Sequence, residues 1–155
     1  MAGARCVIGI GNPDRGDDGV GRVVAEQLRG RVGDGIDVKS LSGEVSGLLD
    51  CLERADAAYL IDAVSSGAEP GAVHRFDVGA APLPSASFAT STHGLGLAEA
   101  IELARAMNCL PSRCIVYAIE AAAFDDGDPL SDAVKAASGL VAEEILAELG
   151  VRQDA

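Results

Sequence analysis

The eight-residue run Ala57–Val64 (AAYLIDAV) constrains the fold of this chain more than any other segment. It is almost continuously apolar, which is typical of a central strand covered on both faces, as in parallel sheets. Shorter apolar runs at Arg5–Ile10, Ile36–Leu41 and Cys114–Ile119 predict further strands, and the alternating segment Ala72–Val78 predicts an edge strand. We therefore expect a sheet of about five strands, most of them buried.

Helical periodicity separates these strands. Apolar residues recur three or four positions apart in about Asp18–Leu28, Gly47–Arg54, Gly94–Met107 and Ser131–Leu149. Strands that alternate with helices of this length favour right-handed crossovers and a mainly parallel sheet. The sequence thus predicts an α/β fold, a three-layer α/β/α sandwich with a mainly parallel twisted sheet. The residues of the third helix expected to face the core are Leu97, Ala100, Ile101, Ala104 and Met107.

The length and the net charge of the chain limit the classes of protein to which it can belong. The 155 residues suffice for a single domain, residues 1–155, that folds without a disulfide or metal. Twenty-four acidic and twelve basic side chains give a net charge of −12, which disfavours contact with nucleic acid or with an anionic membrane. Because neither a secretory signal nor a run of about 18 apolar residues is present, we expect a cytoplasmic protein with no membrane partner.

The four cysteines do not form a disulfide framework. Cys6, Cys51, Cys109 and Cys114 are too few and too scattered in a chain of this length. The Cys109–Cys114 pair also lacks the second pair that a zinc site requires. We therefore expect reduced, half-buried thiols.

The glycine-rich segment that follows the first strand, GIGNPDRGDDGVG (Gly9 to Gly21), is the most unusual part of the chain. Its loop lies at the carboxyl edge of the expected sheet, where α/β proteins bind ligands. A dinucleotide fingerprint would need a third glycine where Asp14 stands. A P-loop would need Lys and Ser or Thr where Asp17 and Asp18 stand. Two carboxylates would repel a phosphate, so phosphate binding here is disfavoured.

Three residues from different segments are candidates for one site at this edge. Asp17 or Asp18 could simply cap the following helix. Asp62, however, is an acid near the end of the apolar central strand, beside the first loop, and its position favours a functional role for these acids. Asp62 could instead accept backbone hydrogen bonds from the next loop. His93 directly precedes the third helix, whereas His74 is expected at the surface of the edge strand. Asp18, Asp62 and His93 together form a ligand set suited to a divalent first-row metal.

At these residues the chain resembles the hydrogenase maturation endopeptidase family. The similar segments are GIGNPDRGDDGVG, LIDAV around Asp62, STHGLGLAEAI around His93 and YAIEAAAFDDGDPLS near the end. The resemblance implies an α/β/α sandwich that removes a C-terminal extension from the large-subunit precursor of a nickel–iron hydrogenase after nickel insertion. It also implies that nickel, supplied by that precursor, is contacted by Asp18, Asp62 and His93.

Other acidic residues and one segment are not assigned by the resemblance. Asp17 adjoins the matched acid and could assist it, while Glu44 and Glu120 lie in similar segments without an assigned role. The segment Ser65–Thr92 matches the family poorly, and we expect it to select one particular hydrogenase.

The resemblance leaves two mechanisms and two other functions open. Nickel could polarise the scissile carbonyl and activate a water molecule, or it could serve only as a recognition handle while Asp18 or Asp62 acts as the general base. The alternative functions are a non-proteolytic protein that senses or delivers nickel and a small nucleotide-binding enzyme. The chain carries neither an HExxH motif nor a GxSxG motif. We expect the protein to act as a monomer on its large substrate.

Overall fold

The computed structural model describes residues 4–12, 14, 16–42, 44–84, 97–122 and 129–151. Its centre is a five-stranded sheet in the order β2-β1-β3-β5-β4. Strands β2, β1, β3 and β5 run parallel, and β4 pairs antiparallel with β5 at the edge. This confirms the predicted mainly parallel sheet and its edge strand. The strands are β1 (Arg5–Ile10), β2 (Ile36–Leu41), β3 (Ala57–Val64), β4 (Val73–Asp77) and β5 (Arg113–Glu120).

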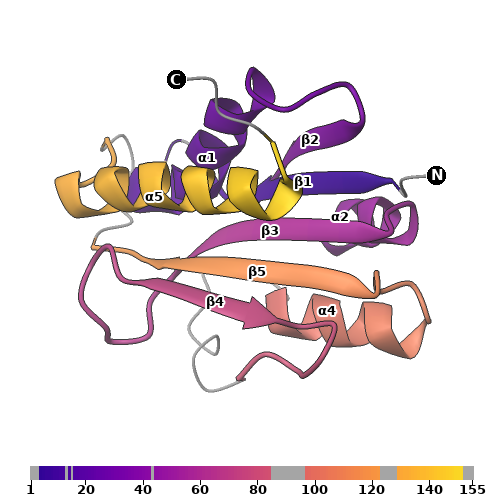
Figure 1. Cartoon of the computed structure of the whole chain (residues 1–155). Coiled ribbons are helices and arrows are strands. Elements are labelled where there is room, and N and C mark those ends of the chain that lie inside the picture. The colour runs from indigo at the N-terminus through magenta and orange to yellow at the C-terminus, as the bar shows by residue number, and fades with distance from the viewer. Residues whose placement is uncertain are drawn as a thin grey trace.

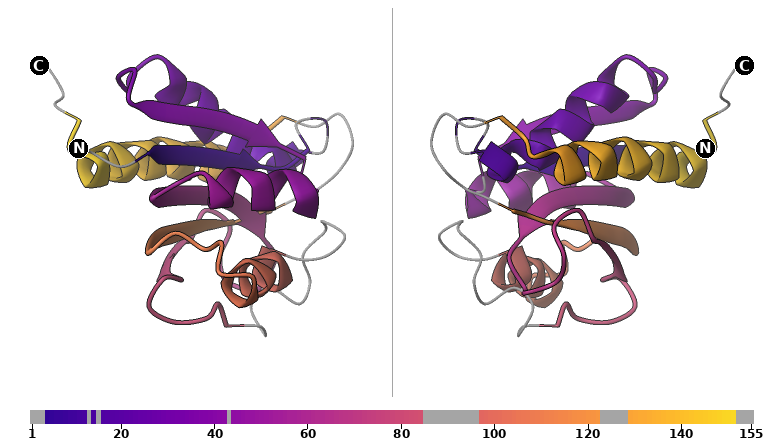
Figure 2. Two further views of the ribbon diagram at one scale, coloured as in Figure 1. Left: turned by 90° about the vertical axis from the view of Figure 1, so that its right-hand side faces the viewer. Right: turned by 90° about the vertical axis from the view of Figure 1, so that its left-hand side faces the viewer.

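Helices cover both faces of the sheet, as the α/β/α prediction requires. Helices α1 and α5 lie on one face, and α2 and α4 lie on the other (Figures 1 and 2). We refer to these as the α5 face and the α4 face. The helices are the 3₁₀ turn η1 (Gly16–Gly19) followed by α1 (Val20–Arg29), α2 (Val45–Glu53), α4 (Leu97–Ala106) and α5 (Asp132–Leu149).

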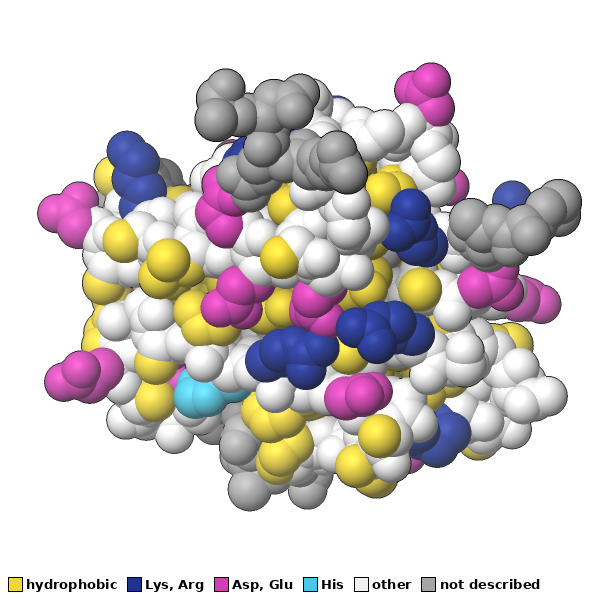
Figure 3. Space-filling model, in the orientation of Figure 1, with side chains coloured by type: hydrophobic (Ala, Val, Ile, Leu, Met, Phe, Trp, Pro, Cys, Tyr) yellow, Lys and Arg dark blue, Asp and Glu magenta, His cyan; other side chains and the backbone are white. Residues whose placement is uncertain are grey.

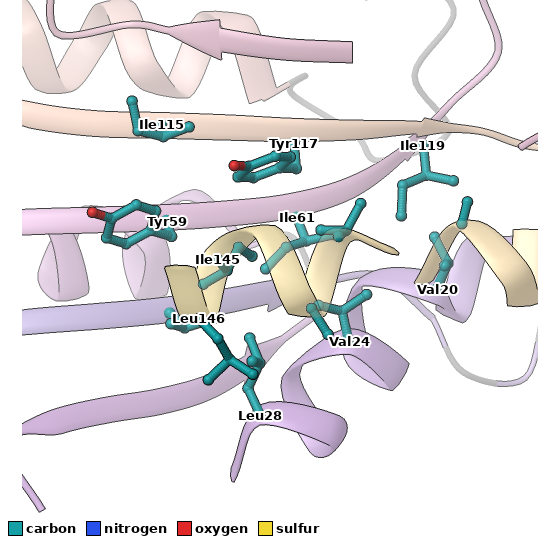
Figure 4. Packing of buried hydrophobic residues seen from close by; sticks show 14 of the residues in the cluster. Val20, Val24, Leu28, Tyr59, Ile61, Ile115, Tyr117, Ile119, Ile145 and Leu146 are labelled. Atoms are coloured by element: carbon teal, nitrogen blue, oxygen red, sulfur yellow. The ribbon is translucent and has the colours of Figure 1, made fainter. Parts of the chain in front are cut away.

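The core on the α5 face is built from aromatic and branched side chains (Figure 4). Val20, Val24 and Leu28 recur at intervals of four and are fully buried, because this spacing places them on one side of α1. They pack with Ile145 and Leu146 of α5 in the same apolar cluster. Burial of each such side chain contributes about 1.5–3 kcal/mol to folding.

The core on the α4 face confirms most of the predicted contacts of α4. Leu97, Ala100, Ile101 and Ala104 are buried. Met107, however, is 55% exposed, so its predicted place in the core is wrong. The helix ends at Ala106, and the chain then turns through Asn108, whose φ of 59° is left-handed. Met107 therefore lies beyond the end of the apolar stripe.

The other predicted boundaries differ from the structure at the ends of elements. The second helix is Val45–Glu53 instead of Gly47–Arg54, and α5 begins at Asp132 after Ser131. Residues 94–96 at the start of the predicted third helix lie outside the described residues. The four cysteines are free thiols, as expected. Cys51 and Cys109 are half-buried as predicted, whereas Cys6 and Cys114 are buried. None of the described helices is long and apolar enough to cross a membrane.

A glutamate near the end of α5 ties this helix to the sheet. Glu148 accepts hydrogen bonds from Arg75 of β4 and from Arg113 and Tyr117 of β5, with an Arg113 Nη2–Oε1 distance of 2.9 Å. Burial raises the pKa of Glu148, but its hydrogen bonds to Arg75 and Tyr117 outweigh that effect, and the pKa lies below its usual value. Basic and acidic side chains accordingly lie side by side on this face of the molecule (Figure 3).

Candidate active site

The glycines of the first loop bring α1 against the sheet at very short range. A Cβ atom on Gly21 would lie 2.4 Å from the carbonyl oxygens of both Ile10 and Ile61. A Cβ atom on Gly9 would lie 2.2 Å from the carbonyl oxygen of Gly21. Gly11 adopts a φ of +148°, and a Cβ there would lie 1.9 Å from the carbonyl oxygen of Asp18. Gly9 and Gly21 therefore allow α1 to pack closely on the strands, and Gly11 allows the first loop to fold back on Asp18.

Asp17 does not cap α1, so the capping interpretation is wrong for this residue. The N-cap of α1 is Gly19, with no side-chain hydrogen bond, and the carboxylate of Asp17 is directed elsewhere. Its Oδ2 accepts from the backbone N–H of Ala122 at 2.7 Å, and its Oδ1 accepts from the N–H of Ser131 at 2.8 Å. The Ser131 hydroxyl adds a third bond at 3.0 Å. Asp17 thus anchors the first loop to the segment that precedes α5.

Asp18 is also no cap, although it is equally buried at 1% exposure. Its Oδ2 accepts a hydrogen bond from the backbone N–H of Asn12 at 3.2 Å, within the same loop. The turn η1 that carries Asp18 follows β1 and contacts β3. Asp18 therefore lies in the loop at the carboxyl edge of the sheet, beside the end of β3.

Asp62 lies near the carboxyl end of β3 and is 1% exposed. Its neighbours Leu60 and Val64 belong to the core of the α4 face, and strand alternation directs Asp62 to the same face. Its Oδ1 accepts from the backbone N–H of Ala63 at 2.8 Å. Ala63 belongs to the same strand, so this contact is a backbone hydrogen bond but not the predicted one from the next loop. The turn η1 with Asp18 adjoins the strand that carries Asp62, as the sequence predicts for two parallel neighbours.

His93, the third predicted site residue, lies outside the described residues. The helix that follows it, α4, begins at Leu97 and packs on the face to which Asp62 is directed. Within the described part of the chain, no group of three or more His, Cys, Asp or Glu side chains could hold a metal ion. The two carboxylates of Asp18 and Asp62 have the donor chemistry that a nickel-type divalent ion accepts, and they are the described members of the predicted set.

The sequence did not predict that Glu120, Ser66 and His74 lie together in a polar cluster on the α4 face. Glu120, at the end of β5, is 2% exposed and accepts hydrogen bonds from the N–H and the hydroxyl of Ser66, at 2.7 and 2.5 Å. His74 Nε2 lies 3.3 Å from Glu120 Oε1. His74 is thus not a simple surface residue, because its side chain is only 32% exposed and faces a buried acid. An acid at the end of a buried strand was the signal used for Asp62, and it would also have found Glu120.

Hydrogen bonding keeps Glu120 ionised. Burial raises the pKa of this carboxyl, but the bonds from Ser66 and from His74 outweigh burial and place the pKa below its usual value. Glu44, by contrast, is an exposed residue at the N-cap of α2 that makes no side-chain capping bond.

Comparisons with known proteins agree with this architecture. The family described as "HycI: Hydrogenase maturation protease" matches residues 43–148. The hydrogenase expression/formation protein HupD of Bradyrhizobium diazoefficiens is 30% identical over 151 residues, which cover 94% of this chain and 79% of HupD.

Comparison with solved structures also identifies proteases of this fold. The [NiFe] hydrogenase maturation protease HycI of Thermococcus kodakarensis superposes with a TM-score of 0.72 and 28% identity, over 97% of this chain and 95% of that one. An endopeptidase from Escherichia coli superposes with a TM-score of 0.79 and 26% identity, over 96% and 94% of the two chains.

The fold and the acidic carboxyl edge define an α/β/α protein with a candidate hydrolytic site at the ends of its central strands. The chain belongs to the hydrogenase maturation protease family. It is accordingly an endopeptidase, a hydrolase that acts on a peptide bond.

Proposed function

We propose that this protein removes the C-terminal extension from the large-subunit precursor of a nickel–iron hydrogenase after nickel has been inserted. The proposal is supported by the family and by the similarity to HycI of Thermococcus kodakarensis, a [NiFe] hydrogenase maturation protease. We further propose that the protein acts as a cytoplasmic monomer, folded as a single domain, on a precursor that is itself folded.

The observation that carries this proposal is the pair of buried carboxylates at the carboxyl ends of neighbouring strands. Asp18 and Asp62 are each 1% exposed, and the turn that bears Asp18 contacts the strand that bears Asp62. Buried carboxylates are costly to desolvate, so they favour a cationic ligand. In the proposal, the nickel of the precursor is that ligand, and His93 completes the donor set.

Nickel is part of the substrate in this mechanism, and it can polarise the scissile carbonyl and activate a water molecule. The acidic residues orient the precursor, so that the scissile peptide bond lies beside Asp18 and Asp62. If nickel serves only as the handle, one of these carboxylates takes the proton from the attacking water. Since both carboxylates are buried, engagement of the precursor requires local opening of this edge.

The decisive experiment measures the intact mass of the hydrogenase large subunit in cells that lack this gene. We expect a retained C-terminal extension, which is removed on complementation with the wild type but not with Asp62→Asn. The variant keeps the size of the side chain and removes its charge, and an unchanged circular dichroism spectrum would show that it folds. A normally trimmed subunit in the deletion strain would contradict the proposed function. Trimming by Asp62→Asn would contradict the site.

A second measurement separates the two roles of nickel. Precursor loaded with zinc, in place of nickel, is incubated with the purified protein. Binding of the zinc form with a much altered cleavage rate favours a catalytic role for the metal, whereas binding and cleavage of both forms at comparable rates favour a metal that serves only as a recognition handle.

A further inference from the structure

Glu120, His74 and Ser66 form a hydrogen-bonded cluster. Its geometry determines which ring nitrogen of His74 carries a hydrogen. Glu120 is ionised and can only accept hydrogen bonds. The contact of 3.3 Å with His74 Nε2 therefore requires that Nε2 carry the hydrogen. In the neutral ring, Nδ1 is left with its lone pair, and in the charged ring Nδ1 carries a proton that can be donated.

The ring of His74 is also held in place from a second side. It stacks on Phe76 of the same strand, with ring centroids 6.4 Å apart and an interplanar angle of 18°. Two contacts of different kinds thus orient an imidazole that is still 32% exposed. A carboxylate that orients a histidine is an arrangement by which enzymes prepare a proton carrier.

Strand register places His74 at the same level as Asp62. His74 pairs with Ala118 of β5, and Ala118 pairs with Asp62 of β3. Alternation directs all three side chains to the α4 face, with the methyl group of Ala118 between the other two. Two strand spacings separate the Cα atoms of His74 and Asp62, about 10 Å. Because Ala118 and Asp62 are buried, a bound peptide reaches both His74 and Asp62 only after the local opening of this edge that the proposed function requires.

Cleavage of a peptide bond needs a proton donor for the leaving nitrogen. In the proposed function, Asp18 and Asp62 are assigned to nickel or to the attacking water. We propose that His74, oriented by Glu120, donates a proton from Nδ1 to the leaving amine during cleavage of the precursor. This inference rests on the proposed function. His74 is then a catalytic residue, and Glu120 is a positioning residue.

The step balances without a further reagent. The oxygen of water forms a bond with the scissile carbonyl carbon, and a carboxylate of the site takes one proton of that water. The carbon–nitrogen bond breaks as the nitrogen accepts the Nδ1 proton of His74. The products are a new C-terminal carboxylate on the large subunit and the released peptide with its free amine. The new carboxyl group loses the second proton of the water to solvent, and the site carboxylate releases the first. Neutral His74 regains a proton from solvent, to which its ring is open.

The test compares single-turnover and steady-state cleavage of nickel-loaded precursor by the wild type, His74→Gln and Glu120→Gln. Gln at 74 can still donate a hydrogen bond to Glu120 but carries no exchangeable charge. We expect kcat of His74→Gln to fall about 10²–10⁴-fold with KM nearly unchanged. The kcat of this variant should depend less on pH than that of the wild type, because Gln carries no proton that can be transferred. Among the described residues, Glu120 is the titratable group in contact with His74.

A structural role is separated from a catalytic one by chemical rescue. Exogenous imidazole should restore part of the kcat of His74→Ala, since it replaces the missing proton donor. Arg75→Gln is the matched control, because Arg75 lies on the same strand but contacts Glu148 on the opposite face. It should leave kcat and its pH profile unchanged.

Each outcome has a distinct meaning. If the wild type cleaves and His74→Gln cleaves with the same kcat and pH profile, the proton-donor role is overturned while the proposed function stands. Loss of kcat without rescue by imidazole, together with a lowered melting temperature of both His74 variants, also overturns it and leaves a role in holding the 65–72 loop. If the wild type leaves the precursor intact, the proposed function itself fails, and this inference fails with it.

Discussion

Asp17 and Ser131 are joined by two hydrogen bonds although 114 residues separate them in the chain. The N–H of Ser131 donates to Asp17 Oδ1 at 2.8 Å, and its hydroxyl donates to Oδ2 at 3.0 Å. The neighbouring Asp18 instead bonds within its own loop, to the N–H of Asn12. These two adjacent acids of similar burial therefore have different roles. Asp17 holds the loop in place, and Asp18 is the candidate site residue.

Replacement of Asp17 should destabilise the fold. Asp17→Ala leaves the N–H groups of Ala122 and Ser131 without their carboxylate, and we expect a loss of about 2–4 kcal/mol in the free energy of unfolding. Urea denaturation followed by circular dichroism measures this loss. Asp14→Ala, at an exposed acid of the same loop, should change it by less than about 0.5 kcal/mol. Equal effects of the two substitutions would contradict the anchoring role.

Two Gly→Ala substitutions should act in opposite directions. Gly21→Ala forces a Cβ to within 2.4 Å of two carbonyl oxygens, so α1 must move away from the sheet, and we expect a loss of several kcal/mol, about 3 or more. Gly139→Ala lies inside α5 with nothing within 4 Å of the new Cβ, and it should stabilise the protein by about 0.5–1 kcal/mol. Thermal unfolding of both variants tests the pair. A tolerated Gly21→Ala would mean that the helix is not held as closely as described.

Removal of Glu148 should weaken the attachment of α5 to the sheet. Its side chain is 15% exposed and accepts bonds from Arg75, Arg113 and Tyr117. Because both arginines are about half exposed, solvent screens the ion pairs, and we expect Glu148→Ala to cost about 1–3 kcal/mol. Glu144→Ala, on the exposed side of the same helix, is the matched control for urea denaturation. A loss no larger than that of the control would show that the network contributes nothing to stability.

The stability of the protein should fall in acid. The pKa values of Glu120 and Glu148 are lowered from 4.5 in the folded state, so the unfolded chain binds protons more readily. The stabilisation from these two groups is therefore complete above pH of about 4.5, and it is lost as pH falls from there through their lower folded values.

The acid dependence can be assigned with one double variant. The free energy of unfolding is measured by urea denaturation between pH 7 and pH 3 for the wild type and for Glu120→Gln/Glu148→Gln. The variant should be less stable at pH 7 and should lose less stability on acidification. Parallel curves for the two proteins would show that other carboxylates cause the acid sensitivity.

The local pattern of apolar and polar residues predicted the strands and helices well. Ala57–Val64 has the bounds predicted for it, because an apolar run between polar residues marks both ends of a buried strand. Met107 was placed wrongly, since periodicity alone does not show where a helix stops. The role of Asp17 was wrong for a different reason: its partners lie more than a hundred residues away, and no local pattern reveals them.

In the candidate site, too, some features follow from the local sequence pattern and others depend on contacts between distant segments. Asp18 and Asp62 could be assigned to one edge because parallel neighbours end together. The pairing of His74 with Glu120 depends on an antiparallel register between β4 and β5, which the sequence pattern does not specify. His93 stays a prediction.

The Asp17 anchor also bears on when the protein can become active during its synthesis. Ala122 and Ser131 leave the ribosome more than a hundred residues after Asp17, so the loop that carries Asp18 has no anchor while the chain is growing. The acidic edge is assembled only once the segment before α5 has been made and has folded back onto the first strand. A nascent chain thus holds the residues of the site without their arrangement, and peptide-bond cleavage begins with the finished fold.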